Sequence, residues 1–155
     1  MLESIERWLA IAERVSDKRA ETLVAEMRNT VEAIKLRPRL IYLATPYSSL
    51  EPRAAETQAE RYEEACCIAA RLLRKGYHVF SPIAASHGIA TIGRLAGDWQ
   101  AWQAFDEHMI LLCDELWVAT EMDGWDQSVG IAAEVEFARS IGKPVVFYGG
   151  ESGSH

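Results

Sequence analysis

A glutamate stands inside an apolar pattern near the end of the chain. Residues 129 to 141, VGIAAEVEFARSI, have helical spacing, and Ser128 or Asp126 can cap the helix before the turn at 142 to 144 stops it. At about 100° per residue, Glu134 falls within the apolar stripe, whose members are Ile131, Val135, Ala138 and Ile141. Glu136 and Arg139 point elsewhere. A carboxylate on the packed face loses water, which raises its pKa, while the nearby helix N-terminus lowers it.

On this stretch alone, a structural glutamate bonded to a neighbouring loop is slightly favoured as the explanation, but two other side chains could work with Glu134. Asp106 borders a predicted stripe and could protonate a leaving group or simply face water. That stripe consists of Trp102, Phe105, Met109 and Leu112. Tyr42 lies on a predicted buried strand, where its hydroxyl needs a partner such as the Glu134 carboxylate.

The segment around Ser128 could bind an anion. DGWDQSVG places Ser128, Gly130 and free backbone amides at a helix N-terminus, where the N–H groups and the helix dipole favour phosphate. An ordinary N-cap is an equally good explanation. TPYSS, residues 45 to 49, is a second hydroxyl-rich turn, but it lacks the glycine spacings of dinucleotide and P-loop sites.

Alternating strands and helices position these residues from Leu40 onward. Strands are predicted at 40–45, 78–83, 115–120 and 144–148. Helices are predicted at 54–75, around Trp99 and Trp102, and at 129–141. A loop is predicted from Ala84 to Gly97. This order predicts a three-layer α/β fold, flavodoxin-like or Rossmann-like. Its parallel sheet would have four or five strands, with helices on both faces.

In such sheets ligands bind outside the carboxyl ends of the strands. The loops there contain TPYSS, SPIAASH and TEMDGWDQSVG. We therefore predict that the substrate-binding residues are Thr45, Pro46, Tyr47, Ser48, Ser86, His87, Trp125, Asp126, Ser128 and Gly130. A lone histidine such as His87 is more often structural than functional.

Residues 2 to 36 are charged and amphipathic and predict two helices, broken near Ser16 and ended by Pro38. The expected organisation is a helical extension at 1–38, an α/β domain at 39–150 and a frayed tail at 151–155. Because the extension offers apolar surface, we expect a homo-oligomer with these helices at or near the interface.

The composition of the chain limits the kinds of partner that it can bind. The net charge is −7, with eight basic and seven acidic residues up to residue 40 and eight and sixteen thereafter. So acidic a domain is a poor binder of nucleic-acid polymers, but a small nucleotide or nucleoside is compatible with it. Without a membrane-spanning run or a signal segment, a cytoplasmic protein with no membrane partner is expected. The cysteines, histidines and carboxylates are dispersed, so we expect no metal and no cofactor.

Four segments together carry a family resemblance: IYLATPYSS, GYHVFSPI, the aspartate ahead of CDELWV, and SVGIAAEVEFA followed by GKPVVF. In order and spacing the chain resembles the nucleoside 2-deoxyribosyltransferase-like superfamily. It is most similar to a branch of small, uncharacterised bacterial and phage proteins with IYLAxPYS and GWxxSxGIxxE motifs. The resemblance covers about residues 40 to 148.

The resemblance implies roles for three residues. Glu134 would be the nucleophile that attacks the sugar C1′, giving a glycosyl-enzyme that water hydrolyses or a second base captures. Tyr42 would orient Glu134, and Asp106 would contact or protonate the departing base. Oligomers that complete the active site across subunits are also common in that superfamily.

One position separates its branches. Six residues before the glutamate the transferases carry an aspartate, whereas Ser128 stands here, as in relatives that hydrolyse nucleoside 5′-monophosphates. A serine hydroxyl suits phosphate and an aspartate would repel it, so we expect a nucleotide N-glycosidase. The alternatives are a nucleoside deoxyribosyltransferase, a non-catalytic nucleotide sensor that signals through the N-terminal helices, and a flavin-binding flavodoxin-like domain.

Overall fold

The chain divides between residues 38 and 39 into two units. The computed structural model describes residues 7, 10–11, 18–47, 54–96 and 99–149. In the first unit, helix α2 spans Lys18–Leu36. Its Val24 and Val31, one heptad apart, are buried, whereas Leu23, Met27 and Ile34 are exposed. Most of the first predicted helix and the tail at 151–155 lie outside the described residues.

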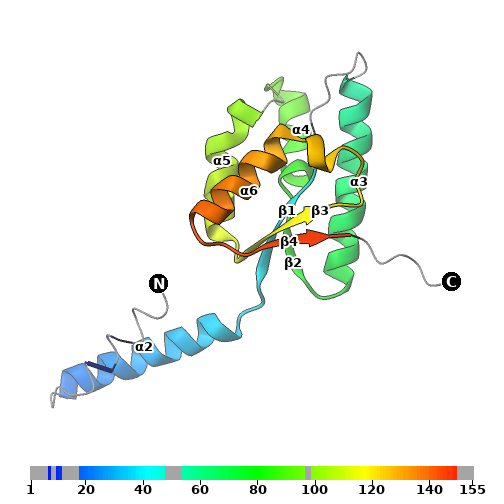
Figure 1. Cartoon of the computed structure of the whole chain (residues 1–155). Coiled ribbons are helices and arrows are strands. Elements are labelled where there is room, and N and C mark those ends of the chain that lie inside the picture. The colour runs from blue at the N-terminus through cyan, green and yellow to red at the C-terminus, as the bar shows by residue number, and fades with distance from the viewer. Residues whose placement is uncertain (1–6, 8–9, 12–17, 48–53, 97–98, 150–155) are drawn as a thin grey trace. The chain divides into compact units, whose positions relative to one another are not determined.

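A parallel sheet of four strands forms the centre of the second unit (Figure 1). The strands are β1 (Leu40–Ala44), β2 (His78–Phe80), β3 (Glu115–Ala119) and β4 (Val145–Tyr148), in the order β2-β1-β3-β4. Tyr42 of β1 lies opposite Phe80 on one side and Leu116 on the other. β1 is therefore an inner strand, and its residues Ile41 to Ala44 are almost completely buried.

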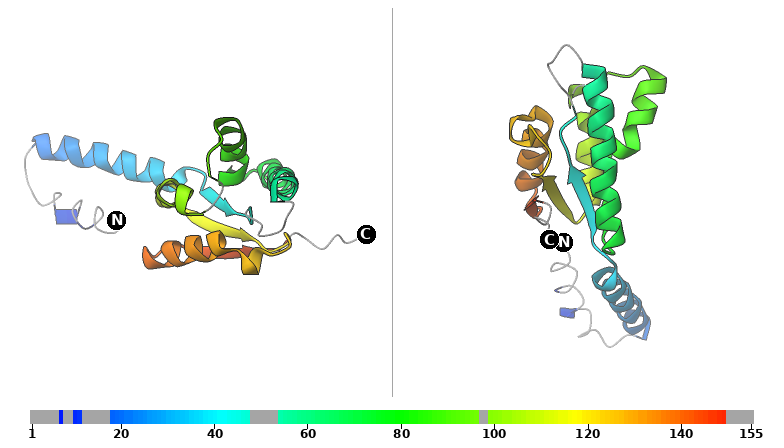
Figure 2. Two further views of the ribbon diagram at one scale, coloured as in Figure 1. Left: turned by 90° about the horizontal axis from the view of Figure 1, so that it is seen from above. Right: turned by 90° about the vertical axis from the view of Figure 1, so that its right-hand side faces the viewer.

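Helices cover both faces of this sheet, as the sequence predicted. These are α3 (Ala54–Arg74), α4 (Pro82–Gly93), α5 (Trp99–Leu112) and α6 (Val129–Ser140). One core lies between the sheet and α5 with α6; it includes Tyr42, Leu116, Ile110, Ile131 and Val135. A second core joins Leu43 to Ile68 and Leu72 of α3. Figure 2 shows α3 and α4 side by side on one side of the sheet and α6 on the other.

Helix α4 corrects the sequence prediction, which extended the second strand to residue 83 and placed a loop at 84–97. The strand ends at Phe80, and α4 begins at Pro82. Ser81 caps α4 by accepting a hydrogen bond from the Ala84 amide at 3.3 Å, and proline suits the first helical position because no amide is needed there. The glycines and serine that suggested a loop lie within a helix otherwise rich in alanine and isoleucine.

Helix α5 buries only part of the predicted stripe: Met109 packs against the core and Trp102 is half-buried. Phe105 and Leu112, expected in the apolar stripe, are 45% and 56% exposed. Asp106, Ile110 and Cys113 are buried instead. Apolar residues such as Phe105, Leu111 and Leu112 also lie on the exposed side of the helix, so periodicity alone did not identify the inward face.

The inward face of α5 can be tested by truncating one residue on each side. Ile110→Ala should lower the free energy of unfolding by about 2–5 kcal/mol, because it leaves a cavity in the core. Leu112→Ala, on the exposed side of the same helix, should change it by about 0.5 kcal/mol or less. Urea unfolding of the two variants measures both values, and equal losses would contradict the observed face.

Candidate functional site

A buried hydrogen bond joins the first strand to the last helix. The Tyr42 hydroxyl donates to Glu134 Oε1 at 2.7 Å. Tyr42 is 0% exposed and Glu134 is 6% exposed, so each polar group depends on the other for a partner. Sequence analysis anticipated this pair from the need of a buried phenol for an acceptor.

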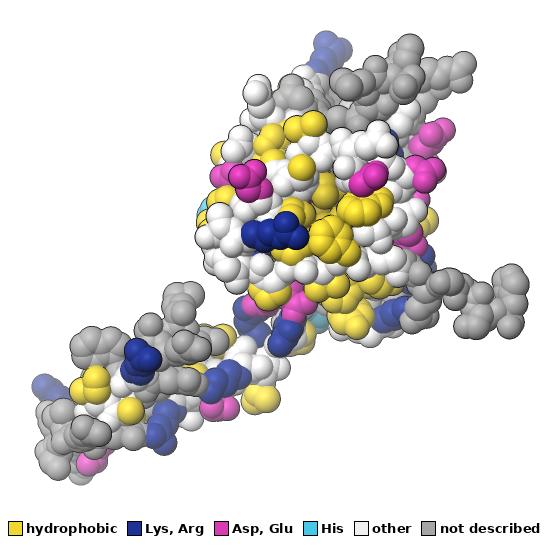
Figure 3. All heavy atoms as spheres, in the orientation of Figure 1, with side chains coloured by type: hydrophobic (Ala, Val, Ile, Leu, Met, Phe, Trp, Pro, Cys, Tyr) yellow, Lys and Arg dark blue, Asp and Glu magenta, His cyan; other side chains and the backbone are white. Residues whose placement is uncertain are grey.

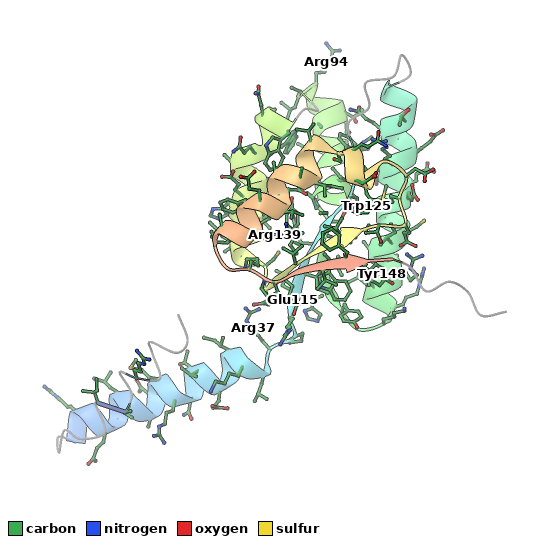
Figure 4. The ribbon with its side chains drawn as sticks, viewed as in Figure 1. Arg37, Arg94, Glu115, Trp125, Arg139 and Tyr148 are labelled. Carbon is green, nitrogen blue, oxygen red and sulfur yellow. The ribbon has the colours of Figure 1, made fainter. Side chains whose placement is uncertain are left out.

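The start of α6 fixes the position of Glu134. Ser128 is the N-cap, and its Oγ accepts a hydrogen bond from the Ile131 amide at 3.3 Å. Glu134 then lies between Ile131 and Ala138 on the buried face, while Glu136 and Arg139 are exposed, as predicted (Figure 4 labels Arg139 on α6). Ile141, expected in the buried stripe, is 41% exposed because the helix ends at Ser140.

Asp106 approaches the same site from α5. It is 7% exposed and sits on the buried face, not at its border as the sequence suggested. Its Oδ1 has no hydrogen-bond partner among the described residues, and neither does Glu134 Oε2. Buried carboxyl oxygens seldom lack a hydrogen-bond partner in folded proteins. A ligand or a water molecule could supply the missing hydrogen bond to each of these two atoms.

Burial controls the protonation of the three groups. It raises the pKa of Glu134 to about 8, with a further rise from the Asp106 charge and an opposing effect of the Tyr42 hydroxyl. Burial also raises the pKa of Asp106 to about 6, again opposed by Tyr42. Burial and the Glu134 charge hold the pKa of Tyr42 well above its usual value. Tyr42 therefore stays a donor, and the carboxyl pair can act as one acid and one base.

The loop before α6 adds residues at the carboxyl edge of the sheet. Helix η1, Trp125–Gln127, precedes Ser128, and Trp125 packs on Phe147 of β4 with ring centroids 5.7 Å apart. Figure 4 shows Trp125 beside β4, and Figure 3 shows apolar side chains gathered between α6 and β4. Asp126 is exposed. These residues border the helix N-terminus that was predicted to bind an anion.

Gly130 lies under a side chain that sequence reasoning left without a role. A Cβ at Gly130 would stand 3.8 Å from Trp99 Cε3 and 3.8 Å from Ser128 Oγ, both ordinary contacts. Trp99, at the start of α5, thus reaches the first turn of α6. No sequence signal pairs Trp99 with Gly130, because only the tertiary fold brings the two helices together.

The other predicted binding residues lie toward the opposite face of the sheet. Tyr47 follows β1, and its hydroxyl is 2.9 Å from Nδ1 of His87 on α4. Ser86 is the neighbour of His87 on that helix. Thr45 is 6% exposed, with its Oγ1 unpartnered, and Pro46 is buried. The predicted set therefore forms two groups, and Ser48 lies outside the described residues.

A family model matches residues 39–150, the region that contains the sheet and every candidate side chain above. That family is DUF1937, described as a domain of unknown function. The chain belongs to the DUF1937 family. None of the curated proteins matches the sequence significantly.

The described part of the DUF1937 domain and of α2 contains no group of three or more His, Cys, Asp or Glu side chains that could hold a metal ion. Among the same residues, none of the helices is both long and apolar enough to cross a membrane.

The raised pKa of Glu134 predicts a pH-dependent stability. Because the folded state holds this proton up to about pH 8 and the unfolded state releases it near 4.5, folding should weaken as pH rises between these values. Glu134→Gln removes that loss. Its stability relative to the native protein should increase by about 1 kcal/mol per pH unit from about pH 5 to 8.

Urea unfolding at several pH values measures this difference, with Glu136→Gln as the control because Glu136 is exposed on the same helix. Parallel stability curves for the native protein and Glu134→Gln would show that Glu134 keeps an ordinary pKa.

Proposed function

We propose that the protein is an N-glycosidase that cleaves the base–sugar bond of a nucleoside 5′-monophosphate. The observation that carries the proposal is the Glu134 carboxyl, which is buried and bonded through Oε1 to Tyr42 but has Oε2 unpartnered. The similarity to nucleoside 2-deoxyribosyltransferase-like proteins, in which a glutamate at this place is the nucleophile, points the same way.

In the proposed reaction, Glu134 Oε2 attacks C1′ of the sugar as the C1′–N bond breaks. The bonding electrons leave with the base, which takes the proton of Asp106. A glycosyl ester on Glu134 results. Asp106, now ionised, then removes a proton from water, whose oxygen attacks C1′ and releases the sugar phosphate and the carboxylate. Throughout, the Tyr42 hydroxyl keeps Oε1 in place and stabilises the anion.

The phosphate in this proposal lies at the start of α6. Ser128 Oγ accepts from the Ile131 amide in the free protein, and its own hydroxyl proton remains available to a phosphate oxygen. The first-turn amides and the helix dipole favour an anion at the same place. An aspartate at this position would repel it.

Base release tests the proposal. Purified protein is incubated with ribo- and deoxyribonucleoside 5′-monophosphates and the matching nucleosides, and free base is measured by chromatography. Glu134→Ala should reduce release to background, and Asp106→Asn should slow it by roughly a hundredfold. Glu136→Ala, on the exposed side of α6, is the matched control. Release that continues in Glu134→Ala would refute the mechanism, and a second free base in the mixture separates transfer from hydrolysis.

The pH profile of kcat/KM should be bell-shaped, with limbs near pH 6 and pH 8. The reactive arrangement has one proton on the carboxyl pair, carried by Asp106 with Glu134 ionised. Because the pKa of Glu134 is the higher of the two, this is the less populated of the two arrangements with one proton. Below about pH 6 the pair gains a second proton, and above about pH 8 it loses its last one. A rate that still rises steadily above pH 8 would contradict a requirement for this proton.

A non-catalytic nucleotide sensor is a second candidate. It is favoured by the division of the chain, since residues 1–38 form a unit of their own that could pass a signal to a partner. A thermal shift by nucleotides that survives Glu134→Gln, with no base released from any substrate, would favour the sensor over the enzyme.

A further inference from the structure

A histidine near the carboxyl edge of the sheet is held by two tyrosines. The imidazole of His87 stacks on the Tyr62 ring of α3, with centroids 4.3 Å apart and an interplanar angle of 16°. The Tyr47 ring meets it edge-on, at 5.9 Å and 85°, and the Tyr47 hydroxyl lies 2.9 Å from Nδ1. Sequence reasoning named Tyr47 and His87 but not Tyr62, which occupies an ordinary helical position.

Among the described residues, these contacts leave one nitrogen of the ring, Nε2, without a hydrogen-bond partner. One ring face lies on Tyr62, and Nδ1 bonds to Tyr47. Burial raises the pKa of the Tyr47 phenol, so it is a proton donor near neutral pH. When the phenol donates to Nδ1, the neutral imidazole carries its proton on Nε2, and the imidazolium carries one there too. Because His87 is only half-buried, an N–H at Nε2 can meet a ligand.

The surroundings favour an anion as that ligand. An imidazole N–H donates to a phosphate oxygen, and neither the stacked Tyr62 ring nor the Tyr47 phenol brings a negative charge to this donor. The nearby basic residue of α3, Arg61, lies against Gly124 and partly offsets the rise that burial causes in the pKa of Glu64. The charge of Arg61 thus interacts with the Glu64 carboxylate. The described residues that contact His87 are two tyrosines, and neither is a carboxylate that would compete with an anionic ligand.

The proposed substrate has such an anion. If only Ser128 and the α6 amides bound the phosphate, all of its hydrogen-bond donors would be uncharged, although the carboxyl groups of Glu134 and Asp106 lie in the same site. The strand order β2-β1-β3 places the turn after β1, with Tyr47, between α4, which follows β2, and the Ser128 loop, which follows β3. A phosphate above the end of β1 can therefore lie between both groups of residues.

We propose that His87, fixed by Tyr47 and Tyr62, binds the 5′-phosphate of the substrate through Nε2 and makes the site selective for nucleoside monophosphates over nucleosides. This inference rests on the proposed function, which it deepens by naming the side chain that makes the site selective for the phosphate. Thr45 precedes Tyr47 by two residues, and its buried Oγ1 has no hydrogen-bond partner among the described residues, so it offers a further hydroxyl at this end of β1.

Equilibrium binding tests this assignment. In the full chain carrying Glu134→Gln, which prevents turnover, calorimetry compares the four deoxyribonucleoside 5′-monophosphates with their nucleosides. The monophosphates should bind about tenfold or more tightly than the nucleosides, the usual effect of a charged hydrogen bond. Adding His87→Gln should remove most of this preference. His78→Gln, at the opposite end of β2 and exposed, is the matched control and should retain it.

A phosphate preference that persists in His87→Gln, or a protein that binds no monophosphate, overturns the inference. If His87→Gln does not fold, Tyr47→Phe decides, because it removes only the hydroxyl that orients the ring; an unchanged preference in that variant would also refute the assignment. His87-dependent binding without base release from any substrate would reject the glycosidase and keep the anion site. Base release from nucleosides, with no monophosphate binding, would do the reverse.

Discussion

The arrangement of the α/β unit depends on one buried hydrogen bond, between Tyr42 and Glu134. A phenol on an inner strand and a carboxyl on a covering helix are both costly to bury alone, and each removes part of the cost for the other. The bond requires β1 to lie inside the sheet and α6 to begin at Ser128, so that Glu134 faces inward. It still leaves Glu134 Oε2 unpartnered, which is a cost that packing alone does not explain.

That remaining cost links stability to chemistry. Asp106, from α5, also has an unpartnered buried oxygen, and its charge adds to the rise in the Glu134 pKa. A fold selected only for stability would replace such a pair with apolar residues. Keeping two carboxyls under the same phenol makes sense when a ligand supplies the missing contacts, and this is the physical basis for regarding the pair as a site.

Sequence patterns predicted most of this framework, because they report local preferences. The four strands and the α6 helix followed from periodicity, and the Ser128 cap followed from residue type. The pairing of Tyr42 with Glu134 could be anticipated because a buried phenol must find an acceptor. Helix α4 was missed because glycine and serine are common in loops, and their effect here is outweighed by the Ser81 cap and Pro82.

Other parts of the site could not be predicted, because they depend on contacts between distant segments. Packing against the sheet and α6 determines which face of α5 is buried. The burial of Asp106 therefore became clear only from the tertiary structure. Tyr62 gains significance only because α3 and α4 lie side by side and bring it onto His87.

The division of the candidate residues between two faces has a simple origin. Side chains alternate along β1, so Tyr42 packs toward α5 and α6 while Leu43 packs toward α3. After the strand ends, the chain can present Tyr47 to α4 on the second side. A ligand above the end of β1 can thus meet carboxyl groups from one layer and a histidine from the other. Because alternate side chains of a strand point to opposite faces, β1 reaches both layers, and as an inner strand it also has the ends of β2 and β3 on either side. In the proposed enzyme, the carboxyl groups that cleave the bond come from one layer, whereas the phosphate is bound by both layers, through Ser128 of α6 and His87 of α4.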